Sequence, residues 1–189
     1  MEILTIHYKT PDLLERLIKS IRVFTSITIR VIDGSDTQEM QRTTALVCSW
    51  YDNIILEQLG YNIHHGRGLD YGLRMSCEEW VLAVDSEVQL LQGIIEAFQF
   101  KTNLEGFCCE VNNSGLNVKQ GILYLHPELL LINNFWYKQQ HFKFIHHGAP
   151  AIDVMKHASL ADKHCMAEQY KELYIRGGRG TVNRFGYNF

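Results

Sequence analysis

The sequence lacks the features that mark several specialised protein classes. Its 189 residues include only three prolines, and neither an internal repeat nor a low-complexity linker divides them. No apolar run approaches the roughly 20 residues that a membrane-spanning helix needs, so we expect no integral membrane segment. The formal net charge of −3 does not indicate a nucleic-acid-binding protein. The chain is therefore expected to form a single globular domain over residues 1–189.

The sequence also lacks the cysteine and histidine spacings that are typical of disulfide-rich proteins and zinc sites. The five cysteines have neither the spacing of a disulfide framework nor the paired Cys-x-x-Cys motifs of a zinc site. The first residues do not combine a basic region with an apolar run, as a secretory leader would. We therefore expect a reducing compartment and a cytoplasmic location. The nine histidines include the adjacent pairs 64–65 and 146–147, whose side chains would diverge, and this disfavours a zinc enzyme.

What the sequence does contain is an alternation of apolar strands and amphipathic helices. The four expected strands cover residues 2–7, 27–32, 54–56 and 80–84. The first two expected helices cover about residues 10–21 and 35–48, and a third follows a loop rich in glycine and histidine at 60–72. This β-α-β-α-β-α-β order predicts an α/β fold with a Rossmann-type, doubly wound and mainly parallel sheet.

The pattern changes after residue 88. Amphipathic helices are expected over residues 90–98 and about 152–170. Strands are expected over residues 106–111 and 121–125, and residues 129–132 form a further short apolar segment. These short segments indicate a C-terminal part in which the strands run in mixed directions.

Two carboxylates follow the strand at 80–84 directly. Asp85 and Glu87 stand at positions i and i+2, and in an extended segment their side chains would point to the same side. In open α/β sheets the ligand lies outside the carboxyl ends of the strands. The pattern therefore indicates a hard divalent cation with an anionic ligand. A solvated acidic turn would give the same pattern.

Other segments carry candidate functional residues with two interpretations each. The glycine-rich segment 66–72 lacks dinucleotide-binding spacing, but it could bind phosphate through backbone N–H groups or form only a tight turn. Asp33 ends the second strand and could accept a hydrogen bond from a base or cap the next helix. Asp153 follows a Gly-Ala-Pro turn and could be a general base or a helix cap. The segment 176–189, rich in arginine and glycine, could close over a diphosphate or be a solvated terminus.

Taken together, these pieces resemble the family 2 glycosyltransferases of the GT-A fold. Residues 3–17 look like the family's opening strand, turn and first helix, and 31–35 (VIDGS) look like its Val-Val-Asp-Asp-Gly-Ser with one residue missing. Residues 62–87 follow the family pattern without a gap, and Asp85-Ser86-Glu87 stands where the family has Asp-x-Asp. The resemblance covers about the first half of the chain.

The resemblance implies transfer of a sugar from a nucleoside diphosphate sugar, expected to be a UDP-sugar, to the hydroxyl of a saccharide or another acceptor. Residues 1–88 would form the nucleotide-sugar-binding half, and 89–189 the acceptor-side half with the C-terminal tail. A Mn²⁺ or Mg²⁺ held by Asp85 and Glu87 would neutralise the leaving diphosphate. Asp153 is the expected catalytic base, which would deprotonate the acceptor hydroxyl.

The same resemblance places further residues around the donor. His7, Tyr8 and Asp33 would line the nucleoside pocket. Arg67 would lie near the diphosphate, and Asp70 takes the place of a family asparagine.

Two other functions fit the same observations. One is a non-catalytic nucleotide-binding module on the same fold, which the short chain favours slightly. The other is a nucleotidyltransferase, which would normally carry a glycine-rich, basic signature after the first strand. Residues 7–11 (HYKTP) do not have that signature.

Overall fold

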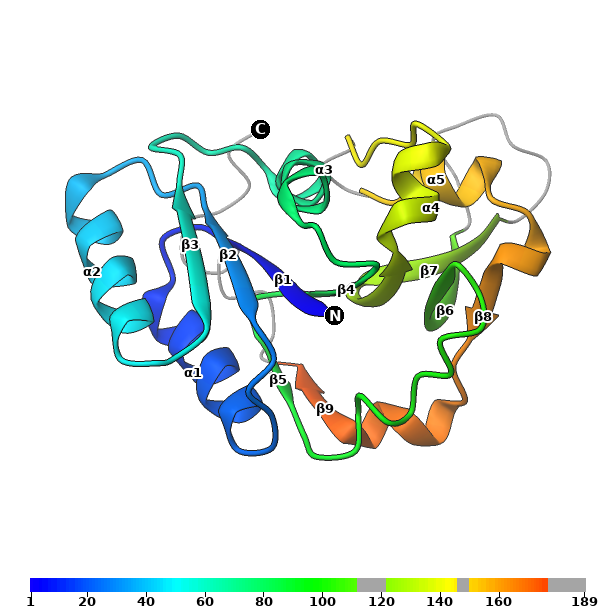
Figure 1. Ribbon diagram of the computed structural model, residues 1–189, viewed down its shortest axis with the longest axis horizontal. Helices are drawn as coiled ribbons and strands as arrows, with labels where there is room; N and C mark the ends of the chain where they lie inside the picture. Colours follow the sequence, from blue (N-terminus) through cyan, green and yellow to red (C-terminus); the bar gives the residue numbers. More distant parts are fainter. Residues whose placement is uncertain (112–121, 146–149, 177–189) are drawn as a thin grey trace.

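The computed structural model describes residues 1–111, 122–145 and 150–176 (Figure 1). The strands are β1 (Glu2–His7), β2 (Ile29–Asp33), β3 (Ile54–Gln58), β4 (Trp80–Val84), β5 (Val88–Leu90), β6 (Leu104–Val111), β7 (Ile122–Asn133), β8 (Lys163–Cys165) and β9 (Tyr174–Arg176). The helices are α1 (Pro11–Arg22), α2 (Gln38–Ser49), α3 (His65–Met75), α4 (Asn134–Gln139) and α5 (Ile152–His157), with 3-10 helices η1 (Leu160–Asp162) and η2 (Glu168–Leu173).

Seven strands form one sheet in the order β3-β2-β1-β4-β7-β6-β8. The first four of these are mutually parallel. Strand β7 runs antiparallel to both β4 and β6, and β8 is parallel to β6. The structure thus confirms the predicted α/β fold, with a mainly parallel sheet and strands of mixed direction towards the C-terminus. The division into two halves at residue 88 stays a prediction.

The chain reverses its direction of travel across the sheet between β1 and β4. It first moves outward from β1 through β2 to β3, and then returns to the other side of β1 as β4. Such a switch point leaves a crevice at the carboxyl ends of the two central strands, where open α/β sheets bind their ligands. The loops that follow β1 and β4 are therefore the first place to look for a site.

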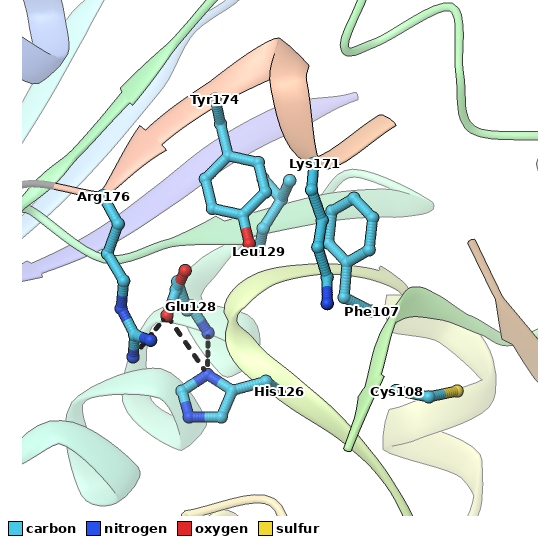
Figure 2. Close-up of a pocket in the computed structure, with 8 residues that line it drawn as sticks. All are labelled: Phe107, Cys108, His126, Glu128, Leu129, Lys171, Tyr174 and Arg176. Atoms are coloured by element: carbon cyan, nitrogen blue, oxygen red, sulfur yellow. Dashed lines mark hydrogen bonds and ion pairs between the residues drawn. The ribbon is translucent and has the colours of Figure 1, made fainter. Parts of the chain in front are cut away.

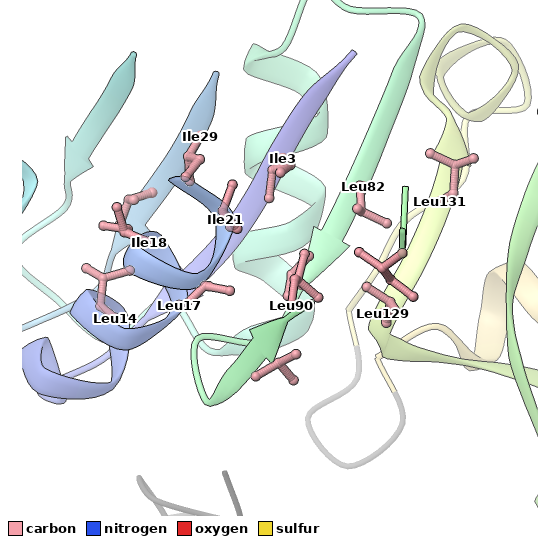
Figure 3. Close-up of a cluster of buried hydrophobic side chains, with 14 of the residues drawn as sticks. Ile3, Leu14, Leu17, Ile18, Ile21, Ile29, Leu82, Leu90, Leu129 and Leu131 are labelled. Atoms are coloured by element: carbon pink, nitrogen blue, oxygen red, sulfur yellow. The ribbon is translucent and has the colours of Figure 1, made fainter. Parts of the chain in front are cut away.

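Helices cover both faces of the sheet, and a hydrophobic core lies under each layer (Figure 1). On one face the apolar side of α1 (Leu14, Leu17, Ile18 and Ile21) packs with Ile3 of β1 (Figure 3). Helices α3, α4 and α5 contribute to the core on the other face. Full burial of a leucine or isoleucine side chain stabilises a fold by about 1.5–3 kcal/mol, so both layers contribute to the stability of the sheet.

Glycines bring α3 unusually close to β1. Gly68 and Gly72 lie inside the helix, so the expected loop over 60–72 gives way to helix at His65. A Cβ atom on Gly68 would lie 2.8 Å from Ile6 Cγ2, and one on Gly72 would lie 2.9 Å from Leu4 Cδ2. Four residues of helix and two residues of strand both rise by about 6 Å. Two glycines four residues apart can therefore contact two strand residues that are two positions apart.

The helix expected over residues 90–98 does not form. Strand β5 occupies its start, and a series of turns follows. Gly93 has a φ of +91°, a conformation that interrupts a helix. Leu91 N donates a hydrogen bond to Leu173 O at 2.8 Å, so pairing with the C-terminal segment overrides the helical periodicity.

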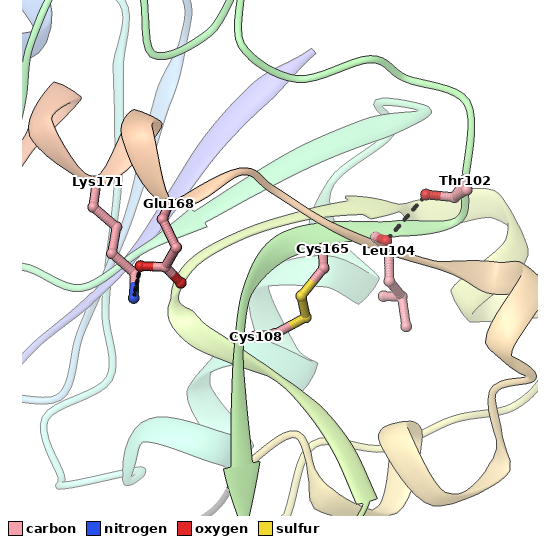
Figure 4. The surroundings of a disulfide bond; sticks show 6 residues. All are labelled: Thr102, Leu104, Cys108, Cys165, Glu168 and Lys171. Carbon is pink, nitrogen blue, oxygen red and sulfur yellow. Dashed lines mark hydrogen bonds and ion pairs between the residues drawn. A yellow bond between two sulfur atoms is a disulfide. The ribbon is translucent and has the colours of Figure 1, made fainter.

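The helix expected over residues 152–170 is also much shorter than predicted, because α5 ends at His157. Ser159 and Asp162 form a capping box that begins η1. Strand β8 then pairs with β6, and a disulfide joins Cys165 to Cys108 across this pair, with the Cα atoms 5.5 Å apart (Figure 4). The cysteine spacing did not reveal this pair.

Two smaller differences complete the comparison. The strand expected at 121–125 and the apolar segment at 129–132 belong to one continuous strand, β7, within residues 122–133. Helix α2 is capped by Thr37, whose side chain accepts a hydrogen bond from Met40 N, and not by Ser35. Within the described ranges, no helix is long and apolar enough to cross a membrane.

The packing of α3 predicts the effect of a single methyl group. Alanine is intrinsically about 1 kcal/mol better than glycine inside a helix. Gly72→Ala should nevertheless lower the free energy of unfolding by about 1–3 kcal/mol, because Leu4 is fully buried and must shift. Urea denaturation measures this change. The loss should be smaller in a Leu4→Val background, and a more stable Gly72→Ala protein would contradict the packing described here.

Candidate active site

The loops after β1, β2 and β4 come together at the switch point. Gly34 N donates a hydrogen bond to His7 O at 2.9 Å, so the loop after β2 is held beside the loop after β1. On the other side of β1, His65 at the start of α3 reaches Asp85 at the end of β4. The first turn of α3 therefore lies at the ligand-binding edge.

The acidic segment after β4 is a tight turn. Val88 N donates a hydrogen bond to Asp85 O at 3.0 Å, which closes the turn between β4 and β5. The extended geometry expected for Asp85 and Glu87 is therefore wrong, although β4 ends where the sequence predicts. Asp85 N also donates to Glu128 O at 3.0 Å, which fixes the turn against β7.

Asp85 and His65 form a partly exposed pair. His65 Nε2 lies 3.1 Å from Asp85 Oδ1, and the two side chains are 29% and 31% exposed. His65 is not among the predicted site residues, although it belongs to the adjacent histidine pair 64–65. Because residues 60–72 were expected to form a loop, the start of α3 at His65 was not predicted. The position of His65 opposite the end of β4 was therefore not predicted either.

The carboxylates after β4 do not form a closed metal site. In the described part of the chain, no three His, Cys, Asp or Glu side chains converge as a closed metal site would require. Mg²⁺ and similar hard cations are usually held by one or two carboxylates, and water and substrate phosphates supply the remaining ligands. Asp85 and the neighbouring Glu87 are both partly exposed, and their binding of a metal stays a prediction.

His7 and Asp33 form a fully buried pair beneath the loops after β1 and β2. His7 Nδ1 lies 3.0 Å from Asp33 Oδ1, and both side chains are 0% exposed. Thr10 N donates to His7 Nε2 at 3.0 Å. Because Nε2 accepts this hydrogen bond, Nδ1 carries the ring proton and donates it to Asp33.

The Asp33 carboxylate also binds the end of β3. It accepts hydrogen bonds from Ser35 N at 2.9 Å and from Gln58 Nε2 at 3.0 Å. Burial alone would raise the pKa of Asp33, but the hydrogen bonds from His7, Ser35 and Gln58 outweigh it and lower the pKa. The structure thus gives Asp33 and His7 a role in shaping the loops, and their direct contact with a nucleoside stays a prediction.

Beside this buried pair lie the half-buried residues Tyr8 and Lys9 and the exposed Asp36. Lys9 Nζ lies 2.6 Å from Asp36 Oδ1, and the Tyr8 hydroxyl donates to Asp36 Oδ2 at 3.0 Å. Lys9 has a φ of +56°, so the loop turns sharply at this residue. The sequence had indicated Tyr8 but not Asp36, because the resemblance placed Asp33 and not Asp36 along the nucleoside pocket.

The two predicted residues on α3 have different surroundings. Arg67 is exposed in the first turn, where the helix dipole favours anions. Asp70 lies about one turn further and accepts hydrogen bonds from Arg74 and from the Tyr137 hydroxyl, the latter at 2.7 Å. The structure therefore uses Asp70 to join α3 to α4, and its contact with a nucleotide stays a prediction.

Asp153 is the second residue of α5, which packs against β7 on the face that also carries α3. Ala151 N lies 3.4 Å from the Tyr124 hydroxyl oxygen, to which it donates. The rings of Tyr124 and His126 lie 6.0 Å apart along the same strand. The residue before α5 is thus joined to β7, and the catalytic role of Asp153 stays a prediction.

Two residues of β7, His126 and Glu128, were missed by the sequence analysis. They line a pocket of about 130 Å³ beside the acidic turn, together with Phe107, Lys171, Tyr174 and Arg176 (Figure 2). A signal was present, because the run ILYLHPELLLI interrupts an apolar strand with His-Pro-Glu. A proline and a charge inside such a strand mark an irregularity where side chains leave the core.

Burial perturbs three titratable groups of this pocket. It raises the pKa of Glu128, while the nearby Arg176 opposes the shift. It raises the pKa of Tyr174 to about 12 and lowers the pKa of His126. Perturbed titratable groups that gather in a pocket are characteristic of functional sites.

The described chain has the fold of the GT-A glycosyltransferases. It is similar to the mannosyltransferase PcManGT from Pyrobaculum calidifontis in complex with GDP-Man and Mn²⁺, with a TM-score of 0.68, 13% identity and 88% of this chain covered. It is also similar to S. aureus TarS 1-349 in complex with UDP-GlcNAc, with a TM-score of 0.60, 16% identity and 92% covered. A third similar structure is GalNAc-T7 with UDP, GalNAc and Mn²⁺, with a TM-score of 0.65, 8% identity and 87% covered.

The chain spans 54%, 61% and 41% of the lengths of these three proteins. Neither a protein-family model nor a curated protein matches the chain. At such low identities the structural similarity establishes the fold, and it leaves the donor, the acceptor and the metal to be argued from the site.

The buried Asp33 predicts a specific dependence of stability on pH. Asp33→Asn should lower the free energy of unfolding at neutral pH by about 1.5–3 kcal/mol, as expected for hydrogen bonds to a charged group. The lowered pKa means that this stabilisation is complete above the unfolded value of 3.8 and is lost as pH falls through the folded value.

Urea denaturation between about pH 7 and pH 3 measures the difference between wild type and Asp33→Asn. The difference should stay constant down to about pH 5 and shrink below pH 4. Asp52→Asn, on an exposed side chain, serves as the control. A difference that grows on acidification would contradict the assigned network.

Proposed function

We propose that this chain is a glycosyltransferase that uses a nucleoside diphosphate sugar, expected to be a UDP-sugar, and a hydroxyl acceptor. The observation that carries the proposal is the position of Asp85, at the end of β4 beside the switch point, in a chain with the GT-A fold. The complexes of similar proteins with GDP-Man, UDP-GlcNAc and UDP support a nucleotide-sugar donor.

The acidic turn suits a leaving diphosphate. Asp85 and Glu87 would hold a Mn²⁺ or Mg²⁺, which when bound neutralises the charge that develops as the glycosidic bond breaks. The first turn of α3 lies beside Asp85, and its backbone N–H groups and Arg67 favour anionic oxygens there. His65 adds a further hydrogen-bonding group on the same side of the turn.

A carboxylate is also needed to accept the proton of the acceptor hydroxyl in a direct displacement. Asp153 is our candidate, because Ala151, just before α5, donates a hydrogen bond to Tyr124, which lies on the part of β7 that extends beyond its pairing with β4. The residues before α5, at 146–149, lie outside the described part of the chain. The same holds for the arginine- and glycine-rich segment after Arg176, which we propose to contact the diphosphate.

A second candidate function is a nucleotide-binding module without transferase activity. It fits the same observations, because the fold and the acidic turn do not themselves require an acceptor. Such a module would keep the nucleotide site and the acidic turn but would not complete the reaction. Hydrolysis of a nucleotide sugar, which needs water as the only acceptor, separates the two functions.

Nucleotide binding is expected to depend on the metal through Asp85. Calorimetry with UDP and with GDP should show binding of at least one nucleotide that strengthens when Mn²⁺ is added. Asp85→Asn should remove the metal-dependent part, about tenfold or more in affinity, since one carboxylate ligand is lost. Asp52→Asn is the matched control on an exposed aspartate. Binding of neither nucleotide, with or without Mn²⁺, would sink the proposal.

The role of Asp153 is separable from nucleotide binding. Asp153→Asn should leave the affinity for the nucleotide unchanged and lower turnover of the donor by about 10²–10⁴, the usual contribution of a general base. Donor turnover is followed by release of the nucleoside diphosphate. Unchanged turnover in Asp153→Asn would place the base elsewhere in the chain.

A further inference from the structure

The pocket beside the acidic turn is fixed in position by backbone pairing on two sides. Glu128 O accepts the hydrogen bond from Asp85 N, so the β7 wall is joined to the first residue of the turn. Strand β9 pairs antiparallel with β5, and Arg176 lies opposite Val88, the residue after Glu87. Any molecule in this pocket is therefore held next to the carboxylates where we place the metal and the diphosphate.

The lining of the pocket is rich in hydrogen-bonding groups. The Glu128 side chain is only 6% exposed, and its Oε2 lies 2.7 Å from Arg176 Nη2. Tyr174 lines the pocket beside the same carboxylate, and Figure 2 shows the three side chains turned towards one another. Glu128 N donates to His126 Nδ1 at 3.2 Å, which leaves the His126 Nε2–H as a donor.

The charges of the lining are already balanced. Arg176 has Glu128 as its partner, and Lys171 has Glu168 at 2.7 Å. A pocket that selected an anionic ligand would instead keep its cations available. The balance favours a neutral ligand that exchanges hydrogen bonds with these groups.

The pocket also has an aromatic wall. The rings of Phe107 and Tyr174 lie 5.3 Å apart and are tilted by 31°. Aromatic faces with a few placed polar groups suit a ring that carries both C–H and O–H groups. A volume of about 130 Å³ is below the ~300–1,000 Å³ of pockets for drug-sized ligands, so one terminal ring fits better than an extended chain.

We propose that this pocket is the acceptor subsite, and that Glu128 and Tyr174 hydrogen-bond the hydroxyl groups of a neutral sugar or polyol at the end of the acceptor. The proposal rests on the proposed function, because it assigns the second substrate of that reaction. It also places the acceptor on the face of the sheet that carries Phe107 and Leu129. Helix α5 packs on the opposite face, so the reacting hydroxyl would have to extend from this pocket over the end of β4 to reach Asp153.

Saturation-transfer NMR on the full chain tests the proposal. The probes are methyl glycosides of glucose, galactose, mannose and N-acetylglucosamine, each with and without UDP and Mg²⁺. At least one glycoside should receive saturation from the wild-type protein. Tyr174→Phe and Glu128→Gln should each weaken its binding about tenfold, as the loss of a buried hydrogen bond predicts. The affinity for UDP with Mg²⁺ should stay unchanged in both variants.

Matched controls come from the same segment of the chain. Tyr170→Phe and Glu172→Gln change the same residue types outside the pocket lining, and both should bind the glycoside like wild type. Glu128 is buried with Arg176, so thermal unfolding must show that Glu128→Gln is folded; Tyr174→Phe removes only a hydroxyl and provides the second variant.

Each outcome decides one of the two proposals. A wild-type protein that binds UDP but none of the glycosides overturns the acceptor subsite. Glycoside binding that survives both substitutions overturns it as well, because the sugar then sits elsewhere. A protein that binds a glycoside through Glu128 and Tyr174 but binds no nucleotide keeps the pocket and loses the proposed function.

Discussion

The pairing of β4 with two different neighbours is the constraint on which the rest of the site depends. Parallel pairing with β1 places the end of β4 at the switch point, and antiparallel pairing with β7 carries β7 beyond that end. Asp85 therefore stands between the first turn of α3 on one side and Glu128 on the other. A slip of one residue in either pairing would turn Asp85 to the opposite face of the sheet and separate these groups.

The parts of the fold that could be read from the sequence are those in which local pattern and tertiary role agree. Residues 80–84 are apolar throughout because β4 is buried on both faces, and the acidic residues follow where the strand leaves the core. Helix α1 was predicted almost to the residue, because its five buried residues have helical spacing and Pro11 sets its start. The position of Asp85 followed from these two elements.

The parts that could not be read depend on partners that are distant in sequence. The helical pattern at residues 90–98 loses to pairing between β5 and β9, whose residues are more than 80 positions apart. The glycines of α3 looked like a phosphate loop, and only the contact with Leu4 and Ile6 shows that they are spaced for packing. His126 and Glu128 form a pocket with Arg176 and Tyr174, which lie about 50 positions later in the sequence, so no local pattern predicts that pocket.

The arrangement of β9 also has a consequence for the order in which the site can be completed. Strand β9 is the last strand described, and it supplies both a partner for β5 and the side chains that face Glu128. Domains fold as units while the chain is synthesised from its N-terminus. The acidic turn therefore gains its second wall only after residue 176 has left the ribosome, and until then Glu128 lacks its ion pair with Arg176.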